Sequence, residues 1–589
     1  MIEVYKRTKM CGELRKENIG EEVVLNGWVA KQRSLGALIF VDLRDKTGIS
    51  QIVFDSTVSA EIFELAASLR SEYVIGVKGT VRERESKNMQ IPTGEVEVVA
   101  SGLVLYSEAD TPPIYIKDDD NVSEDLRMKY RYLDLRKPHM QQNLAFRSKL
   151  YKVTRDYFYE NGFTEVETPM LAKPTPEGAR DYLVPSRVNH GKYYALPQSP
   201  QIFKQLLMVG GTDRYMQIAR CFRDEDLRAD RQPEFTQIDL EMSFVDQDQI
   251  IDIQEKYLKR VFKEMLNVDI QIPLQRMTWT DAMNRFGSDK PDLRVGFELK
   301  DLKAAVENCN FSVFTDALAN GGRVMGIDMD GCSEKFSRKD IDKMTESIKT
   351  FGAKGLVWIR FEEGEIKSSV NKFFSQEELA KIGEVFGAKK GDLVLIVSGA
   401  EKVCWDSLGF LRRDLAGKLG MLKDDDYKLL WVVDFPMFEW SDEEGRYMAM
   451  HHPFTSPKPE DIHKLAEGDL GSILADAYDI VLNGVELGGG SIRIHDRKLQ
   501  RQIFDALKLT DEEIKVKFGF FLEAFSYGAP PHGGLAYGLD RMCMLLCGAD
   551  SIRETIAFPK NAGAICVMSE APTVVSQQQL DELAIKNVE

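Results

Sequence analysis

The chain has 589 residues, 43% of them hydrophobic and 10% aromatic, and carries a formal net charge of −17 at pH 7. Its length exceeds what a single hydrophobic core supports, so we expect several domains. The acidic balance excludes indiscriminate coating of nucleic acid, which needs concentrated lysine and arginine, but it leaves room for a local basic face.

The sequence contains no membrane-spanning or secretory signal. A span needs about 18 uninterrupted apolar residues, and the N-terminus lacks the apolar core of a signal peptide. The cysteines form no C-x-x-C pair, which favours reduced thiols and disfavours structural zinc. We therefore expect a soluble, cytoplasmic protein that binds no membrane.

The N-terminal part, residues 1–107, is predicted to be an OB-type β-barrel. Residues 22–105 contain three short alternating runs, a helical run and two further alternating runs, the order of such a barrel. One face of an OB barrel often binds single-stranded nucleic acid. A plain barrel with solvated arginines is the alternative. The candidate groups for a binding face are Phe40, Gln51, Arg33, Arg82 and Arg84.

Residues 108–143 are polar and proline-punctuated, and they predict a hinge. A helix is expected over 143–163, ended by Gly162, and after it a strand over 164–171 that contains Pro169. Because proline cannot donate to a central ladder, that strand should lie at a sheet edge. Residues 144–292 form the first half of the expected catalytic domain.

The stretch 214–241 predicts two strands joined by a polar loop that begins at Phe222-Arg223-Asp224-Glu225. With a period of two, one face of the second strand is polar and the other apolar. An ordinary amphipathic hairpin would show the same alternation. The polar face carries Phe235, Gln237, Asp239 and Glu241, and the apolar face carries Thr236, Ile238, Leu240 and Met242.

Residues 293–425 mix helical and strand patterns without clustered catalytic-type residues, so an inserted α+β domain is expected there, and 426–589 should hold the second catalytic half and a C-terminal extension. The fold class is multidomain α+β. In the second half, His451 and His452 are adjacent and would point to opposite faces of a strand, which disfavours a two-histidine metal site.

The Asn483-Gly484 pair predicts a tight hairpin turn. With that turn, Val481 lies opposite Glu486, Asp479 lies opposite Gly488, and the two carboxylates share a face. Paired carboxylates suit Mg²⁺ and its bridging to phosphates. Arg493 has the wrong parity for this face unless the glycine run 488–490 contains a bulge, which we infer.

A strand is expected to enter a helix at 538–541, where Arg541 lies in the first turn. A guanidinium there is electrostatically poor unless a polyphosphate lies nearby, although a plain surface arginine is an equal alternative. Together with Arg223, Asp479 and Glu486 it would suit a nucleoside triphosphate and Mg²⁺. Neither a P-loop nor a dinucleotide fingerprint occurs in the sequence.

These motifs together resemble those of a known family. The segment ending at Pro169, the FRDE to QIDLE hairpin and GLAYGLDR are similar to motifs one, two and three of the class II aminoacyl-tRNA synthetases. The segments 175–187, 198–208 and 450–457 resemble the bacterial-type aspartyl-tRNA synthetases. The likeness covers nearly the whole chain and implies L-aspartate, ATP, Mg²⁺ and tRNA(Asp) as substrates and ligands, with a homodimer formed through motif one.

The resemblance implies a role for each matching residue. Arg223 and Arg541 are the implied catalytic residues, and Asp479 and Glu486 the metal ligands. The implied ATP-binding residues are Arg223, Asp224, Glu225, Gln232, Phe235, Glu486, Gly538, Leu539, Asp540 and Arg541, with Phe235 and Arg541 stacking on the adenine. The implied aspartate-binding residues are Lys204 and Arg493 for the side chain, Glu177, Ser199, Gln201 and Asp239 for the ammonium, and Arg223, His451 and His452.

In the barrel, the resemblance places Phe40 under an anticodon base, with Gln51, Arg33, Arg82 and Arg84 nearby. Lys31 departs from the arginine usual in the family. Leu35 and Lys87 look like the forms that charge aspartate tRNA alone, since relatives that also charge asparagine tRNA usually carry histidine and glycine there. The alternatives are an asparaginyl- or lysyl-type synthetase, a non-catalytic nucleic-acid-binding paralogue and an ATP-dependent amide ligase.

Overall fold

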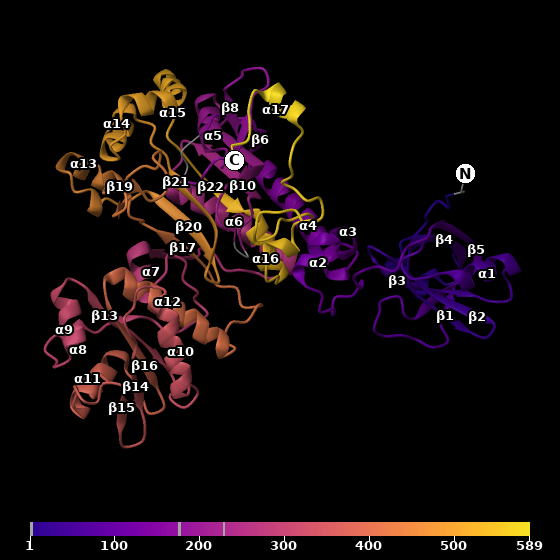
Figure 1. Cartoon of the computed structure of the whole chain (residues 1–589), viewed down its shortest axis with the longest axis horizontal. Coiled ribbons are helices and arrows are strands. Elements are labelled where there is room, and N and C mark those ends of the chain that lie inside the picture. The colour runs from indigo at the N-terminus through magenta and orange to yellow at the C-terminus, as the bar shows by residue number, and fades with distance from the viewer. Residues whose placement is uncertain (1–3, 175–177, 228–229, 589) are drawn as a thin grey trace. The chain divides into compact units, whose positions relative to one another are not determined.

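The computed structural model describes residues 4–174, 178–227 and 230–588. The chain divides into two compact units (Figure 1). The first contains residues 1–148, 227–232 and 549–575, and the second contains 149–226, 233–548 and 576–589. The domain boundaries expected from the sequence stay predictions. No helix in the described ranges has the apolar run that crossing a bilayer requires.

The first unit is built around a closed barrel with the strand order β1-β2-β3-β5-β4, which confirms the OB-type prediction. Alternate residues of β1, such as Val23 and Leu25, point into a core that is sealed from solvent. The elements are β1 (Glu22–Leu35), β2 (Leu38–Asp45), β3 (Gly48–Phe54), α1 (Ala60–Ser68), β4 (Val74–Glu83) and β5 (Val96–Ser107), followed by α2 (Glu124–Lys129) and α3 (Arg131–Asp134).

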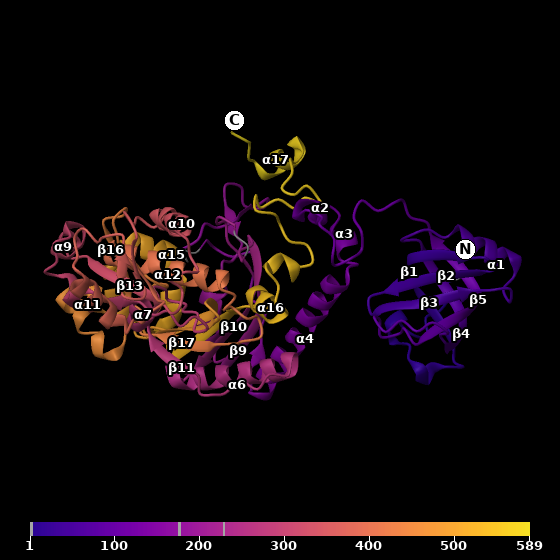
Figure 2. The same ribbon diagram turned by 90° about the horizontal axis from the view of Figure 1, so that it is seen from below.

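The second unit is organised by a sheet with the order β11-β17-β20-β21-β22-β10-β9-β6. The helix α6 (Gln247–Leu266) covers one face of it (Figure 2), where Tyr537 donates a hydrogen bond to Gln254 and the Tyr257 ring lies 5.5 Å away. The strands are β11 (Gln275–Thr278), β17 (Leu429–Val433), β20 (Ala477–Leu482), β21 (Val485–Ile492), β22 (His532–Gly538), β10 (Glu234–Ser243), β9 (Arg214–Phe222) and β6 (Thr164–Glu165).

The segment around Pro169 is only partly as predicted. The strand β6 lies at the sheet edge, as expected, but it pairs with β9 only at Thr164 and Glu165 and ends well before Pro169. The preceding helix α4 (Pro138–Glu160) begins earlier than expected, because proline is tolerated in a first helical turn.

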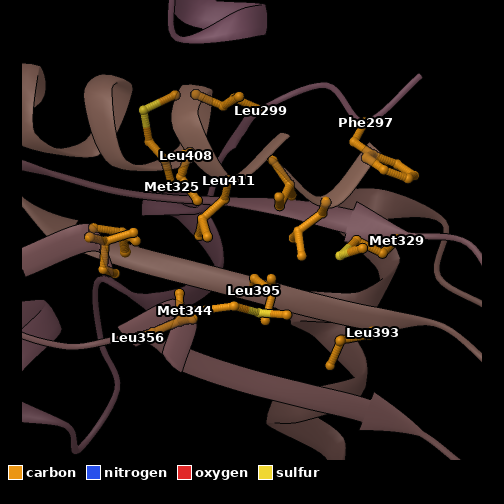
Figure 3. Close-up of a cluster of buried hydrophobic side chains, with 14 of the residues drawn as sticks. Phe297, Leu299, Met325, Met329, Met344, Leu356, Leu393, Leu395, Leu408 and Leu411 are labelled. Carbon is orange, nitrogen blue, oxygen red and sulfur yellow. The ribbon is translucent and has the colours of Figure 1, made fainter. Parts of the chain in front are cut away.

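A separate sheet with the order β12-β13-β16-β14-β15 lies within the predicted insertion. A hydrophobic cluster fills one of its faces, with Met325, Met344, Leu395 and Leu408 shown in Figure 3. The elements are β12 (Lys300–Asp301), α8 (Lys303–Val306), α9 (Ser312–Ala319), β13 (Arg323–Met329), α10 (Arg338–Lys349), β14 (Val357–Phe361), β15 (Ile366–Ser368), α11 (Gln376–Phe386), β16 (Leu393–Gly399) and α12 (Glu401–Lys418).

The insertion shows no clustered catalytic-type residues in its sequence, but folding brings three of its aspartates together. Carboxylate oxygens of Asp328, Asp330 and Asp392 lie within 4.8 Å of one another. Burial, together with the charges of Asp392 and Asp330, raises the pKa of Asp328 to about 7. The cluster was hidden in the sequence because β13 and the turn before β16 are adjacent only in the folded sheet.

The remaining elements of the second unit surround the main sheet. They are β7 (Leu183–Pro185), β8 (Tyr193–Ala195), α5 (Gln201–Val209), α7 (Trp279–Phe286), β18 (Phe438–Ser441), β19 (Arg446–Ala449), α13 (Lys464–Glu467), α14 (Arg497–Ala506), α15 (Asp511–Ala524), α16 (Leu539–Cys547) and α17 (Gln577–Leu583).

Candidate active site

One face of the main sheet collects charged side chains from three strands. In the ladders, Asp239 pairs with Ala536 and Ala536 pairs with Gly489, which in turn pairs with Asp479. Directly paired residues point to the same side of a sheet. Asp239, Glu241 and Asp479 therefore share one face, while Ile238 lies on the opposite face under α6, as the alternation predicts.

The hairpin between β20 and β21 contains the inferred bulge, at a different residue. Val481 pairs with Glu486 as expected, but Asp479 pairs with Gly489 and not Gly488, because the register shifts between Val481 and Ile480. The extra residue is Leu487, just before the glycine run. This shift gives Arg493 the parity of the Asp479 face, as its predicted role requires.

Four buried charged groups form a connected cluster on this face. The Lys204 ammonium of α5 lies 2.7 Å from Asp239 Oδ1 and 3.2 Å from Glu241 Oε2. Arg493 donates from Nε and NH2 to the two oxygens of Glu241, at 2.9 and 3.1 Å. Its NH1 donates to Ser491 Oγ at 2.6 Å. Lys204 and Arg493, which the family resemblance assigns to the same ligand group, are thus joined by one carboxylate.

The pKa values of the two carboxylates in the cluster are shifted in opposite directions. Burial would raise the pKa of Glu241, but Arg493 and Lys204 outweigh it and lower that pKa to about 2. Burial dominates at Asp239 and raises its pKa despite Lys204. Asp239 Oδ2 is buried and accepts no hydrogen bond from the described residues. Buried carboxylate oxygens are usually hydrogen-bonded, so this oxygen is an acceptor available to a ligand.

Beside this cluster runs a polar chain that the sequence did not reveal. Gln201 donates to Gln205 at 3.0 Å, and the Gln205 amide lies 3.0 Å from His532 Nε2. His532 Nδ1 lies 2.7 Å from the carbonyl oxygen of Pro530, and burial lowers the histidine pKa. Neutral His532 therefore donates from Nδ1 and accepts at Nε2, which fixes the orientation of both glutamines.

Glu241 itself was on the predicted polar face but was not assigned to the site. A usable signal was present in the glycine pair of β22: a Cβ placed on Gly534 would lie 2.1 Å from Glu241 Oε2. The glycine is required because the carboxylate occupies that space.

The two adjacent histidines do not lie on a strand, which corrects that expectation. They follow β19 in an irregular segment. His452 Nε2 lies 2.9 Å from Arg493 NH1, and the His451 ring packs edge-on against Phe435 with centroids 4.9 Å apart. Burial lowers the pKa of both rings.

The expected triphosphate residues lie directly after β9, on β10, at the start of α16 and on the hairpin. The Arg223 guanidinium stacks on Phe235 at 5.1 Å. Arg541 NH1 donates to the Glu486 carbonyl at 2.8 Å and lies 3.9 Å from Glu486 Oε2. Gly538 pairs with Gln237 at the start of α16. Arg541 and Glu486 are thus brought together, and Arg223 and Phe235 are brought together.

Other residues of the expected ATP set occupy supporting positions. Asp540 is buried and accepts a hydrogen bond from the Thr236 backbone at 2.7 Å, and Leu539 is fully buried. The Asp224 backbone amide donates to the Arg180 carbonyl oxygen at 3.1 Å, and Glu225 follows Asp224 in the same loop. Gln232 belongs to the first unit, where its side-chain amide exchanges two hydrogen bonds with the Lys560 backbone.

The Asp479–Glu486 pair has the chemistry of a divalent-cation site. Burial and then the charges of Glu486 and Asp289 raise the pKa of Asp479 well above its usual range. A Cβ on Gly489 would lie 2.3 Å from Asp479 Oδ1, so the glycine keeps space for the carboxylate. Oxygen ligands in a half-buried, repulsive pair fit Mg²⁺. The sequence missed Asp289 and Lys290 beside this pair.

The expected aspartate-binding set also includes Ser199 and Glu177. Ser199 Oγ accepts a hydrogen bond from the Gln201 backbone at 3.3 Å. Glu177 lies outside the described residues. Downstream of it, Gln198 is fully buried and binds Ala179 through both its amide oxygen and nitrogen, at 3.1 and 2.8 Å.

In the barrel, several of the predicted nucleic-acid residues share one face. Arg33 pairs with Phe40 across β1 and β2, stacks on its ring at 5.9 Å and donates to Gln51 at 3.2 Å. Acidic partners that the sequence missed hold this set: Asp42 lies 2.9 Å from Arg33, and Glu97 accepts from Gln51 at 2.7 Å.

The other barrel residues surround this face. Arg82 binds Glu97 at 2.8 Å, and Lys87 binds Glu83 at 2.9 Å. Leu35, at the end of β1, is 66% exposed, Lys31 is exposed, and Arg84 is half-buried.

Comparison with known proteins matches both units to families. The family model "tRNA synthetases class II (D, K and N)" matches residues 123–562, and "OB-fold nucleic acid binding domain" matches 23–106. The chain is 56% identical over 583 residues to the aspartate–tRNA(Asp/Asn) ligase of Caldanaerobacter subterraneus subsp. tengcongensis, covering 99% of this chain and 98% of the relative. It is 55% identical over 584 residues to the aspartate–tRNA ligase of Clostridium perfringens, with the same coverage.

Solved structures share the fold at low identity. Asparaginyl-tRNA synthetase from Pyrococcus horikoshii, complexed with asparaginyl-adenylate, has a TM-score of 0.60 at 18% identity and covers 94% of this chain and 98% of its own. A putative aspartyl-tRNA synthetase from Leishmania major has a TM-score of 0.59 at 18% identity, with 95% of both chains covered.

Proposed function

The chain belongs to the class II tRNA synthetases of the D, K and N group, and from that premise we propose that it is an aspartate–tRNA ligase. It would activate L-aspartate with ATP and transfer the aspartyl group to the 3′ end of tRNA(Asp). The observation that carries the choice of amino acid is the cation pair, Lys204 and Arg493, buried on the polar sheet face and joined through Glu241.

A site with two cations selects for a side-chain carboxylate. An asparagine amide would place N–H donors against N–H donors, and a lysine ammonium would meet like charge. The rival asparaginyl and lysyl specificities are therefore disfavoured by charge as well as by hydrogen bonding. The ligand's α-ammonium would bind Asp239 Oδ2, which accepts no hydrogen bond from the described residues. Gln201, Ser199 and Glu177 would complete that end.

The first chemical step needs positioning and charge neutralisation, not a protein nucleophile. An oxygen of the aspartate α-carboxylate attacks the α-phosphorus of ATP, the new P–O bond gives aspartyl-adenylate, and pyrophosphate leaves with the bond electrons. Arg223 would contact the carboxylate and the α-phosphate, since a planar guanidinium suits two oxygens. Phe235 would stack on the adenine, and Arg541 would reach the γ-phosphate.

Asp479 and Glu486 would hold Mg²⁺ at the leaving-group end. A bound Mg²⁺ would neutralise the phosphate oxygens and orient the pyrophosphate. In the second step the terminal ribose hydroxyl of the tRNA attacks the aspartyl carbonyl carbon. The C–O ester bond forms as AMP leaves.

The barrel face would bind the anticodon, with Phe40 stacking on a base and Arg33, Gln51 and Arg82 near the base edges. Lys31, Arg84 and Lys87 would add positive charge. Leu35 and Lys87 support discrimination against tRNA(Asn). The relative that is 56% identical is named as a ligase for tRNA(Asp/Asn), whereas the relative that is 55% identical is named only as an aspartate–tRNA ligase. Overall similarity therefore does not decide whether tRNA(Asn) is charged.

We also propose a homodimer through the first motif. Met170 and Leu171 are exposed next to Ala172, which bridges to Ala195 beside the exposed Tyr193 and Tyr194. Exposed apolar residues gathered in this way are typical of a subunit interface. Sedimentation equilibrium would give twice the chain mass, and a monomer at micromolar concentration would contradict the proposal.

Charging purified tRNA(Asp) and tRNA(Asn) side by side with labelled aspartate tests the function. We expect acid-precipitable label on tRNA(Asp) and little on tRNA(Asn). Equal labelling of both tRNAs would contradict the proposed discrimination against tRNA(Asn) but would support the ligase assignment. Labelling of neither, with ATP and Mg²⁺ present, would remove the ligase assignment.

A further inference from the structure

The predicted hinge segment, residues 108–143, is attached to the barrel through the side chain of Arg136. Its NH1 donates to Glu72 Oε2 at 2.8 Å, and its guanidinium lies 4.9 Å from the centre of the Trp28 ring. Trp28 belongs to β1, and Glu72 lies just before β4. The part of the chain that the structure describes shows no other ion pair or ring contact between the hinge segment and the barrel.

Glu72 is a rigid anchor for this contact. It is 4% exposed, and its backbone adopts φ of +66°, in the left-handed region where residues other than glycine are uncommon. Its amide donates to the Val29 carbonyl at 2.7 Å, and Arg44 NH2 donates to its two carboxylate oxygens at 2.9 and 2.7 Å. A strained backbone of this kind persists only where its surroundings determine it. Glu72 is thus held by the barrel independently of Arg136.

The anchor lies on the same face of the barrel as the proposed anticodon residues. Phe40, Asp42 and Arg44 alternate along β2, and the residues between them, Val41 and Leu43, are fully buried. Because successive side chains of a strand point to opposite faces, the three share the outer face. Phe40 and Arg44 are four residues apart, about 13 Å along the strand. The stacking site for a base and the attachment of the hinge segment are therefore joined by one short length of strand.

Under the proposed function, one tRNA binds at two places, with its anticodon at the barrel and its 3′ end at the second unit. Once the first contact is made, the second becomes intramolecular, and its effective concentration depends on the stiffness of the connection between the two sites. Here the connection is the hinge segment, and Arg136 lies two residues before α4 begins at Pro138. A contact that fixes this end of the segment stiffens the connection.

We propose that Arg136 is a positioning residue for tRNA. By binding Glu72 and Trp28, it fixes the orientation of the barrel on the hinge segment, so that a tRNA bound by its anticodon is directed toward the second unit. Arg136 acts through this alignment and not by contact with the reacting atoms. The inference deepens the proposed function at the step of tRNA binding and rests on it for the identity of the RNA.

The test compares the binding of two RNAs to the full chain, tRNA(Asp) and its isolated anticodon stem–loop, by fluorescence anisotropy. Arg136→Met removes the ion pair and the planar stack but keeps a long side chain. The Kd for tRNA(Asp) should rise by about fivefold or more, since the effective concentration of the second contact falls. The Kd for the stem–loop should be unchanged, because the stem–loop spans only the barrel. The KM for tRNA(Asp) in charging should rise in parallel, and tRNA-independent pyrophosphate exchange should be unchanged.

Two further variants separate alignment from charge. Arg136→Lys keeps a cation within reach of Glu72 and should recover much of the affinity for tRNA(Asp). Lys16→Met removes a cation from the barrel, where Lys16 pairs with Glu95 at the same distance of 2.8 Å, and should alter the binding of neither RNA.

Two results would overturn the proposal. Equal weakening of both RNAs in Arg136→Met would show that Arg136 supports the barrel itself, and unchanged binding of tRNA(Asp) would show that the contact aligns nothing. The binding assay contains neither aspartate nor ATP. Charging by the unmodified protein decides the ligase assignment separately, so the failure of one proposal is distinguishable from the failure of the other.

Discussion

Both carboxylate oxygens of Glu241 accept hydrogen bonds from Arg493, at 2.9 and 3.1 Å, and Glu241 Oε2 lies 3.2 Å from the ammonium of Lys204. The ion pair between Glu241 and Arg493 connects β10 to the residue that follows β21. The two cations expected to bind a substrate carboxylate are thus held in place before any substrate arrives. Preorganisation of this kind lowers the entropic cost of binding.

Replacing Glu241 with glutamine should destabilise the second unit. The change leaves two buried cations without their shared counter-charge, which costs about 3 kcal/mol. Because the folded-state pKa of Glu241 is about 2, below its ordinary value of 4.5, its contribution is complete above pH 4.5 and is lost as the pH falls toward 2.

The measurement is thermal unfolding of the parent and of Glu241→Gln between pH 7 and pH 3. The parent should melt higher at pH 7, and the difference should shrink below pH 4.5. A difference that stays constant with pH would show that Glu241 is not held as a carboxylate by Lys204 and Arg493.

Arg223→Ala should reduce aspartate-dependent ATP–pyrophosphate exchange by on the order of a hundredfold or more, since the guanidinium would neutralise charge in the transition state. The unfolding midpoint should change little, because Arg223 stacks on Phe235 at a half-buried position. Arg220→Ala, on the strand β9 that ends just before Arg223, is the matched control, since it removes the ion pair with Glu234 and the hydrogen bond to Thr236. Near-normal exchange in Arg223→Ala would eliminate the proposed role.

Gly489→Ala should impair the metal site although it replaces no charged residue. The new methyl group would lie 2.3 Å from Asp479 Oδ1 and must displace that carboxylate. We expect a higher Mg²⁺ concentration for half-maximal exchange, by on the order of tenfold. In the control Gly519→Ala the nearest neighbour is 3.8 Å away, so Mg²⁺ dependence should be normal. Normal Mg²⁺ dependence in Gly489→Ala would place the ion elsewhere.

Phe40→Ala should impair the charging of tRNA(Asp) but leave the formation of aspartyl-adenylate unchanged. Loss of a base–aromatic stack costs roughly 1–3 kcal/mol, so the KM for tRNA(Asp) should rise by about fivefold or more. Exchange without tRNA should be unchanged. The readouts are charging kinetics and pyrophosphate exchange on the same preparation, and an unaltered KM for tRNA would show that Phe40 makes no stacking contact with the anticodon.

Much of the fold was predictable because its signals are local. Alternating apolar residues along β1 indicate the barrel, and Asn483-Gly484 indicates the hairpin that carries Asp479 and Glu486. The parity of Arg493 requires a bulge in that hairpin if Arg493 is to share the face of Asp479. The predicted position of the bulge was off by a residue or two because glycine permits a bulge but does not determine where the ladder shifts.

The missed residues are those whose roles depend on distant partners. Glu241 acquires its function from Arg493, which is separated from it by 252 positions, and Gln205 from His532, which is separated by 327. Asp289 and Lys290 belong to a loop that reaches the hairpin only through the packing of Asp292 against Gly484. Sequence periodicity reports which face a side chain occupies, but it does not report the residue that meets it there.

The most direct test is ATP–pyrophosphate exchange with aspartate, asparagine and lysine supplied separately to the unmodified protein. Two buried cations around Glu241 predict exchange with aspartate and almost none with the other two. Exchange driven by asparagine or lysine, with aspartate inert, would contradict the assignment of Lys204 and Arg493 to a substrate carboxylate.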